Sequence, residues 1–193
     1  MDNFFNLVAQ TYPLPNKIIQ QLLKKAKTLQ LQKGEIFPNK HPQFIIVIQG
    51  AIKTYMIDEN QKEIIISIRF VNNTAFIVRN LAENQLSSKI HKTLVDTTIL
   101  TIPISFIDKH QKKHPEINDF LLETLYHEKK NLMNAYINLL SLKPYDRFFK
   151  TLEQHPNLLH LINDDEWASL LGIKKSKFIK IKNKYEQIIQ SPL

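Results

Sequence analysis

Residues 164–184, DDEWASLLGIKKSKFIKIKNK, decide the C-terminal part of the fold. The small residue Ala168 is followed four positions later by Gly172, one of only three glycines among 193 residues. This spacing is typical of a helix-turn-helix, in which the small residue lets two helices approach and the glycine makes the turn with a positive φ. Asn163 or Asp164 is expected to cap the first helix. Five apolar positions fit the packing between the helices: Trp167, Leu171, Ile173, Phe178 and Ile181.

The second helix of this motif concentrates positive charge, because residues 174–184 hold six lysines and no acid. On a helical wheel, Phe178 and Ile181 share one face, and a polar edge around Lys180 lies opposite. Such an edge, bordered by cations, suits the major groove of DNA between its phosphate walls. The alternative is a solvated, lysine-rich helix from an AT-rich genome. The candidate DNA contacts are Lys174, Lys175, Ser176, Lys177, Lys180, Lys182 and Lys184.

Composition limits the class of protein. The formal net charge of +8 suits an anionic partner such as nucleic acid. The absence of cysteine excludes disulfides, iron–sulfur clusters and thiol catalysis. No apolar run approaches the roughly 20 residues of a membrane span, and the N-terminus, MDNFFNLVAQ, lacks the pattern of a secretion signal. We therefore expect a cytoplasmic protein with no membrane partner.

The first hundred residues are predicted to form mostly β-strands. Residues 15–28 have the apolar spacing of a helix, and short β-rich runs follow from Leu29. Because these runs end at turn residues, they predict an antiparallel sandwich or roll. The segment DENQK (58–62) is predicted to be a hairpin turn in which Asn60 is able to take positive φ. The expected strands lie within 29–37, 43–57, 63–70 and 93–102.

A long helix is predicted over residues 116–141. Its apolar side chains form two neighbouring stripes, and one domain surface could cover only part of a face that wide. We expect the same helix of a second subunit to cover the remainder, which gives a homodimer; burial within its own domain is the alternative. Glu128 interrupts the first stripe. That stripe comprises Ile117, Leu121, Leu125, Leu132, Ala135 and Leu139, and the second comprises Leu122, Tyr126, Met133, Tyr136 and Leu140.

Pro144 fits the first turn of a further helix, and the rest of the chain is predicted to be all-α, with helices near 144–154, 164–171 and 174–190. The fold class is therefore α+β: an N-terminal antiparallel β-roll, a long dimerisation helix and a C-terminal helix-turn-helix domain.

This order of elements resembles the Crp/Fnr family of bacterial transcription regulators over nearly the whole chain. The segments LQLQKGEIF, FIIVIQGAIKTYMIDENQKEIIISI and LVDTTILTIPISFID are similar to strands of the family's cyclic-nucleotide-binding-like domain. LSLKPYDRFFKTLEQHPNL resembles the start of its DNA-binding domain, with Arg147 at the usual arginine. The resemblance implies a sensor roll over 1–115, a dimerisation helix over 116–141 and a DNA-binding domain over 142–193. It also implies a homodimer whose second helix-turn-helix helix enters the major groove.

Three departures from the family pattern affect function. Val78-Arg79 stands where the nucleotide cassette has Gly-Glu, and Ser87-Ser88 stands where it has Arg-Ser. Arg79, Ser87 and Ser88 remain candidate ligand contacts, but cyclic AMP is not expected to bind and the effector is unassigned. The second helix begins Lys174-Lys175 instead of serine and arginine and contains no arginine, so bidentate reading of guanine is unavailable to it. We also expect no wing strands after this helix.

Catalytic and metal sites are not expected. His110 and His114 have a spacing that could hold a metal on a helix, but they lie in the lysine-rich stretch KHQKKHP, which itself contains no acid ligand. No phosphate-binding glycine loop, Gly-x-Ser-x-Gly or cupin His-x-His motif occurs. Two hypotheses remain: a DNA-binding regulator with a sensory roll and no bound cofactor, or a ligand-binding or protein-interaction module with a vestigial DNA-binding domain.

Overall fold

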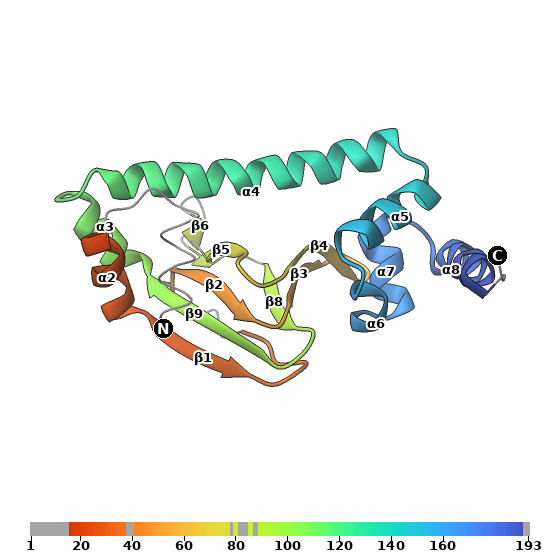
Figure 1. Ribbon diagram of the computed structural model, residues 1–193, viewed down its shortest axis with the longest axis horizontal. Helices are drawn as coiled ribbons and strands as arrows, with labels where there is room; N and C mark the ends of the chain where they lie inside the picture. Colours follow the sequence, from red (N-terminus) through yellow and green to blue (C-terminus); the bar gives the residue numbers. More distant parts are fainter. Residues whose placement is uncertain (1–15, 38–40, 78, 81–84, 87–88, 191–193) are drawn as a thin grey trace. The chain divides into compact units, whose positions relative to one another are not determined.

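The computed structural model describes residues 16–37, 41–77, 79–80, 85–86 and 89–190. The chain forms two compact units: residues 1–54 with 68–130, and residues 55–67 with 131–193. The α+β class is confirmed, with strands in the N-terminal part, one long helix and a helical C-terminal part (Figure 1). The domain boundaries at 115 and 141 stay predictions.

The first unit contains a sheet of four strands in the order β1-β9-β2-β5. All three pairings in this sheet are antiparallel, and β1 and β9 run side by side in Figure 1. The short strands β6 and β7 form a separate antiparallel pair. The strands are β1 (Lys27–Leu31), β2 (Gln43–Gln49), β5 (Thr74–Ile77), β6 (Arg79–Asn80), β7 (Gln85–Leu86) and β9 (Thr97–Pro103).

Strand β2 is buried on both faces. Because side chains alternate along a strand, Phe44 and Ile46 face one apolar cluster while Ile45 and Val47 face another. The first cluster also receives side chains from three helices. These are α2 (Asn16–Lys25), α3 (Ile104–Gln111) and α4 (Glu116–Ser141). The helix predicted over 116–141 is therefore confirmed, and its N-terminal turns help to close the core.

A second sheet has the strand order β4-β3-β8, with β3 (Ile52–Ile57), β4 (Glu63–Arg69) and β8 (Ile90–Thr93). Strands β3 and β4 are joined by the predicted hairpin turn. The positive φ of this turn is at Gln61 (60°) and not at Asn60, the residue that the sequence suggested for it. The carboxylate of Asp58 explains the shift: it accepts the backbone N–H groups of Asn60 (2.9 Å) and Lys62 (2.8 Å) and so organises the turn.

The C-terminal helices match the prediction closely. They are α5 (Pro144–Gln154), α7 (Asp164–Leu171) and α8 (Lys175–Gln190). One short helix, α6 (Leu158–Leu161), was not predicted. Leu158, which is 1% exposed, is the buried side chain of this helix. A single buried residue in a four-residue helix gives no periodic pattern in the sequence, so the helix could not be predicted from it.

Candidate nucleic-acid interface

Helix α7 begins with a complete capping box. The side chain of Asn163 accepts the backbone N–H of Asp165 (2.9 Å) and of Glu166 (3.0 Å), and Glu166 accepts the backbone N–H of Asn163 (2.8 Å). Asn163 is therefore the cap, rather than Asp164. This arrangement satisfies the first N–H groups of the helix and fixes where it starts.

Gly172 ends α7 in the left-handed conformation, with φ 64° and ψ 40°. The backbone N–H of Ile173 returns to the carbonyl of Ala168 at 2.9 Å, which closes the turn. The predicted positive φ is thus confirmed. Ala168 is 2% exposed, as a small residue between two close helices should be.

Helices α7 and α8 pack through aromatic side chains. Trp167 and Phe178 stack with their ring centroids 5.7 Å apart and an interplanar angle of 8°. Phe148 of α5 lies against both rings, at 5.2 Å and 5.9 Å. All three side chains are at most 1% exposed. This cluster holds the pair rigid, so the face of α8 opposite Phe178 keeps a fixed direction relative to α7.

Arg147 connects α4, α5 and α7. One guanidinium nitrogen donates to the carbonyls of Leu139 (2.9 Å) and Leu142 (2.8 Å), and the other donates to the carbonyl of Leu171 (2.9 Å). These carbonyls belong to the C-terminal turns of α4 and α7 or follow them, where the helix itself offers no donors. The arginine therefore has a structural role, satisfying helix ends.

The predicted DNA contacts occupy the first turns of α8 and the turn before it. Ser176 and five of the six lysines are exposed, and Lys182 is half-buried. Ile179 is 37% exposed on the same outward surface as Lys180. Opposite them, Phe178 (0%) and Ile181 (8%) face the core. The helix thus presents a polar, cationic surface outward.

Acidic side chains of α7 form ion pairs with two of these lysines. The sequence pattern did not predict these pairs. The ammonium of Lys175 lies 2.7 Å from Asp165, and that of Lys182 lies 3.0 Å from Asp164. The hydrogen bond and charge of Asp165 raise the pKa of Lys175 above its ordinary value. The run DDE at the start of α7 was the available signal, since the turn brings it beside the start of α8.

The other lysines are arranged differently. The ammonium of Lys184 lies over the ring of Tyr145, 4.8 Å from its centroid. In the described part of the chain, Lys174, Lys177 and Lys180 have no acidic partner. Together with Ser176, they are the groups of α8 and of the turn before it that are most free to meet an anionic ligand.

Of the three candidate ligand contacts, the structure describes only the backbone of Arg79. Arg79 lies in β6, where its backbone pairs with that of Leu86. Ser87 and Ser88 lie outside the described residues. These three positions remain predictions.

A partly buried polar network lies in the first unit instead, and the sequence pattern did not predict it. The guanidinium of Arg69 donates to the Thr54 hydroxyl (2.7 Å), the Thr74 carbonyl (2.8 Å) and the carboxylate of Glu128 (3.0 Å). The Thr54 hydroxyl also lies 2.9 Å from Nδ1 of His91. Glu128, the residue that interrupts the apolar stripe of α4, is therefore an ion-pair partner.

The surroundings of His91 favour its neutral form. Burial, together with the charges of Arg69 and Lys89, lowers the pKa of His91 to about 4. Because arginine can only donate, the Thr54 hydroxyl accepts from Arg69, and its own proton and second lone pair allow it to donate to Nδ1 of His91 or to accept from it.

The histidine pair considered as a metal site has another arrangement. Nδ1 of His110 lies 2.9 Å from the carbonyl of Phe106 in its own helix, and its ring packs on the Phe106 ring with centroids 3.9 Å apart. Within the described residues, no three acidic or histidine side chains are grouped as metal ligands. Over the same residues, no helix has the length and apolar character needed to cross a bilayer.

The fold is that of the Crp/Fnr transcription regulators. A regulator assigned to this family from Eubacterium rectale superposes with a TM-score of 0.71 at 15% identity, covering 94% of this chain and 88% of that one. FixK2 from Bradyrhizobium japonicum gives 0.70 at 12% identity, covering 84% and 85%. The c-di-GMP-responsive regulator CLP from Xanthomonas campestris gives 0.66 at 14% identity, covering 90% and 92%.

Sequence comparison adds nothing to this likeness. No protein-family model matches the chain, and a search of the curated proteins finds no match. At these identities the likeness establishes the fold, and function has to be argued from the site.

Proposed function

We propose that this protein is a dimeric, DNA-binding transcription regulator of Crp/Fnr type that acts by binding and not by catalysis. The observation that carries the proposal is the outward surface of α8 and of the turn before it, where Lys174, Ser176, Lys177 and Lys180 are exposed on a rigidly packed helix-turn-helix. Such a helix can place a polar edge against bases while its cations contact phosphates. Action on chromosomal DNA would place the protein in the cytoplasm.

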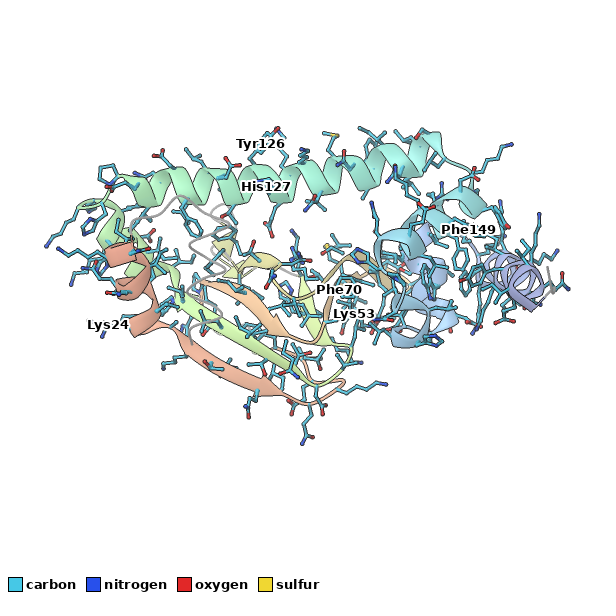
Figure 2. The ribbon with its side chains drawn as sticks, in the orientation of Figure 1. Lys24, Lys53, Phe70, Tyr126, His127 and Phe149 are labelled. Atoms are coloured by element: carbon cyan, nitrogen blue, oxygen red, sulfur yellow. The ribbon has the colours of Figure 1, made fainter. Side chains whose placement is uncertain are left out.

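Dimerisation through α4 is part of this proposal. The C-terminal two thirds of α4 expose apolar side chains that include Tyr126 at 59% and Leu140 at 69% (Figure 2 shows Tyr126 on the helix). An apolar surface of this extent on one helix is typical of an interface, and a second copy of the helix would cover it. Two reading helices on one dimer would engage two half-sites of DNA.

The first unit is proposed to be sensory, with an effector other than cyclic AMP. Support comes from the sequence at 78–79 and 87–88, which lacks the glutamate and arginine that hold a cyclic nucleotide in the family. A cyclic phosphate without a cation to neutralise it would be costly to bury. Arg79 and Lys89 are the cations nearest to these positions in the sequence.

The test is DNA binding by wild-type protein, Lys177→Ala and Lys180→Ala, measured by fluorescence anisotropy across salt concentrations. Each protein is titrated with a site selected from random DNA and with unselected DNA. We expect Lys177→Ala to weaken both and to reduce the salt slope by about one unit. Lys180→Ala should weaken the selected site more, by about 1–3 kcal/mol. Equal, weak binding of all three proteins without a change in slope would contradict the proposal.

A second candidate function is a ligand-binding or protein-interaction module with a vestigial DNA-binding domain. The specific observation in its favour is the engagement of Lys175 and Lys182 by acids of α7 in a helix without arginine. The same titration separates the two functions, because this alternative predicts no site preference.

A further inference from the structure

The hydroxyl of Ser169 joins helix α7 to the edge of strand β4. Its oxygen accepts the backbone N–H of Ile65 at 2.9 Å and donates to the backbone carbonyl of Glu63 at 3.0 Å. All three residues belong to the second compact unit, although Glu63 and Ile65 are separated from Ser169 by more than a hundred positions in the sequence.

The position of β4 explains what the serine does. Among the described strands, β4 is an outer strand of the sheet β4-β3-β8, so its side away from β3 faces no other strand of that sheet. The carbonyl of residue 63 and the N–H of residue 65 point to the same edge, as groups two positions apart do. One hydroxyl therefore satisfies both, where a neighbouring strand would otherwise be needed.

The chemistry is specific to a hydroxyl. Only a group that donates and accepts from a single atom can bridge these two backbone groups at the observed distances. Serine and threonine have such an atom on Cβ, and alanine has none. Ser169 is half-buried, so loss of the hydroxyl would leave both backbone groups poorly solvated.

Strand β4 is also fixed at its other end. Arg69, its last residue, donates to Thr54 of β3 and to Glu128 of α4. The strand has seven residues, which correspond to roughly 20 Å of extended chain. Its N-terminal residues belong to the second unit and its last two to the first. It is thus a short, extended segment with specific side-chain contacts at both ends.

We propose that Ser169 is a positioning residue for DNA reading, and that β4 is the element to which the first helix of the helix-turn-helix is fixed. This rests on the proposed function. The hydroxyl sets the position of α7, and α8 follows because Trp167 and Phe178 lock the two helices together. Ser169 contacts β4 and leaves the outward surface of α8, with Ser176, Lys177 and Lys180, available to DNA.

The experiment compares full-length wild type, Ser169→Ala and Ser169→Thr. Hydrogen exchange is read at the amide of Ile65, which donates to the serine, and affinity is measured for a DNA site selected with wild-type protein. We expect Ser169→Ala to speed exchange at Ile65 by about tenfold and to weaken DNA binding about 3- to 10-fold, the effect of one or two lost hydrogen bonds. Ser169→Thr should restore both.

Thr151→Ala is the matched control, since the Thr151 hydroxyl donates at 2.8 Å to the Arg147 carbonyl within its own helix. It should leave exchange at Ile65 unchanged. Unchanged exchange and affinity in Ser169→Ala would overturn the proposal, and so would tighter DNA binding, which would make the contact inhibitory. If wild type binds no DNA but Ser169→Ala still speeds exchange at Ile65 and Ser169→Thr restores it, the proposed function fails while the fixing of α7 to β4 is supported.

Discussion

The ammonium of Lys175 lies 2.7 Å from the carboxylate of Asp165 and links the first turns of α8 and α7. Both side chains are at least half exposed, so the pair is accessible to an incoming phosphate. A phosphate that approaches Lys175 meets Asp165 as well. The acids at the start of α7 therefore compete with DNA for the cations of the surface proposed to bind it.

Replacing Asp165 by asparagine should strengthen DNA binding whatever the sequence. The change frees Lys175 and removes a like charge beside phosphate, so we expect affinity to rise about 2- to 10-fold at low salt and the salt slope to steepen by about one unit. Anisotropy titrations across salt measure both. Glu153→Gln, which removes an exposed acid from α5, is the matched control for net charge. Equal effects of the two variants would show that the Asp165–Lys175 pair has no special role.

Replacing Gly172 by alanine should destabilise the second unit. A side chain at φ 64° is strained, and its Cβ would lie 2.9 Å from a terminal carbon of Leu139. We expect a loss of about 1–2 kcal/mol, mostly from the backbone, because the Leu139 side chain can shift. Thermal unfolding measures it. Gly34→Ala is the comparison, since Gly34 has φ 85° with no atom within 4 Å of a Cβ. A Gly172→Ala protein as stable as wild type would contradict the strain argument.

Lysine at Leu125 and Leu132 should dissociate the proposed dimer. Both side chains lie on the exposed apolar surface of α4, at 48% and 45% exposure in the single chain. In the dimer, the two introduced ammonium groups of each subunit would be buried without an acidic partner, which is unfavourable for association. Sedimentation should show dimers of wild type and monomers of the double variant at micromolar concentration. Lys129→Ala, an exposed change on the same helix, should remain dimeric. A monomeric wild type would rule out the α4 interface.

Features with a local cause could be predicted from the sequence. The span of α4 follows from apolar side chains recurring at helical spacing, and the turn at Gly172 follows from a glycine between two such runs. The limit of this approach is visible in the hairpin turn, where the positive φ is at Gln61 and not at Asn60. Both residues lie in the turn, and the choice depends on which N–H groups the Asp58 carboxylate accepts.

Contacts between distant residues could not be predicted in the same way. Glu128 interrupts an apolar stripe in the sequence, but its partner Arg69 is 59 positions away on another element. Ser169 is an ordinary helix residue until the fold brings the edge of β4 beside it. The acids of α7 were visible, yet their pairing with Lys175 and Lys182 depends on the crossing of two helices. A single sequence has no signal for such pairings.

His91 should make the protein less stable as the pH falls. Its pKa is about 4 in the folded state against an ordinary value of 6.5, so the unfolded chain binds more protons between these values. The contribution is fully present above pH 6.5 and is lost as the pH falls to 4. The shift of about 2.5 units corresponds to about 3 kcal/mol.

Denaturant unfolding of wild type and His91→Gln, measured at intervals from pH 7.5 to pH 4, tests this expectation. The variant should be less stable at pH 7.5, because glutamine fits the site beside Thr54 less well, and its stability should fall less over the acid range. Since carboxylates also titrate there, the difference between the two proteins is the quantity of interest. His127→Gln, on the exposed side of α4, is the control and should follow wild type. Parallel curves for wild type and His91→Gln would show that His91 is not the group whose neutral form the fold requires.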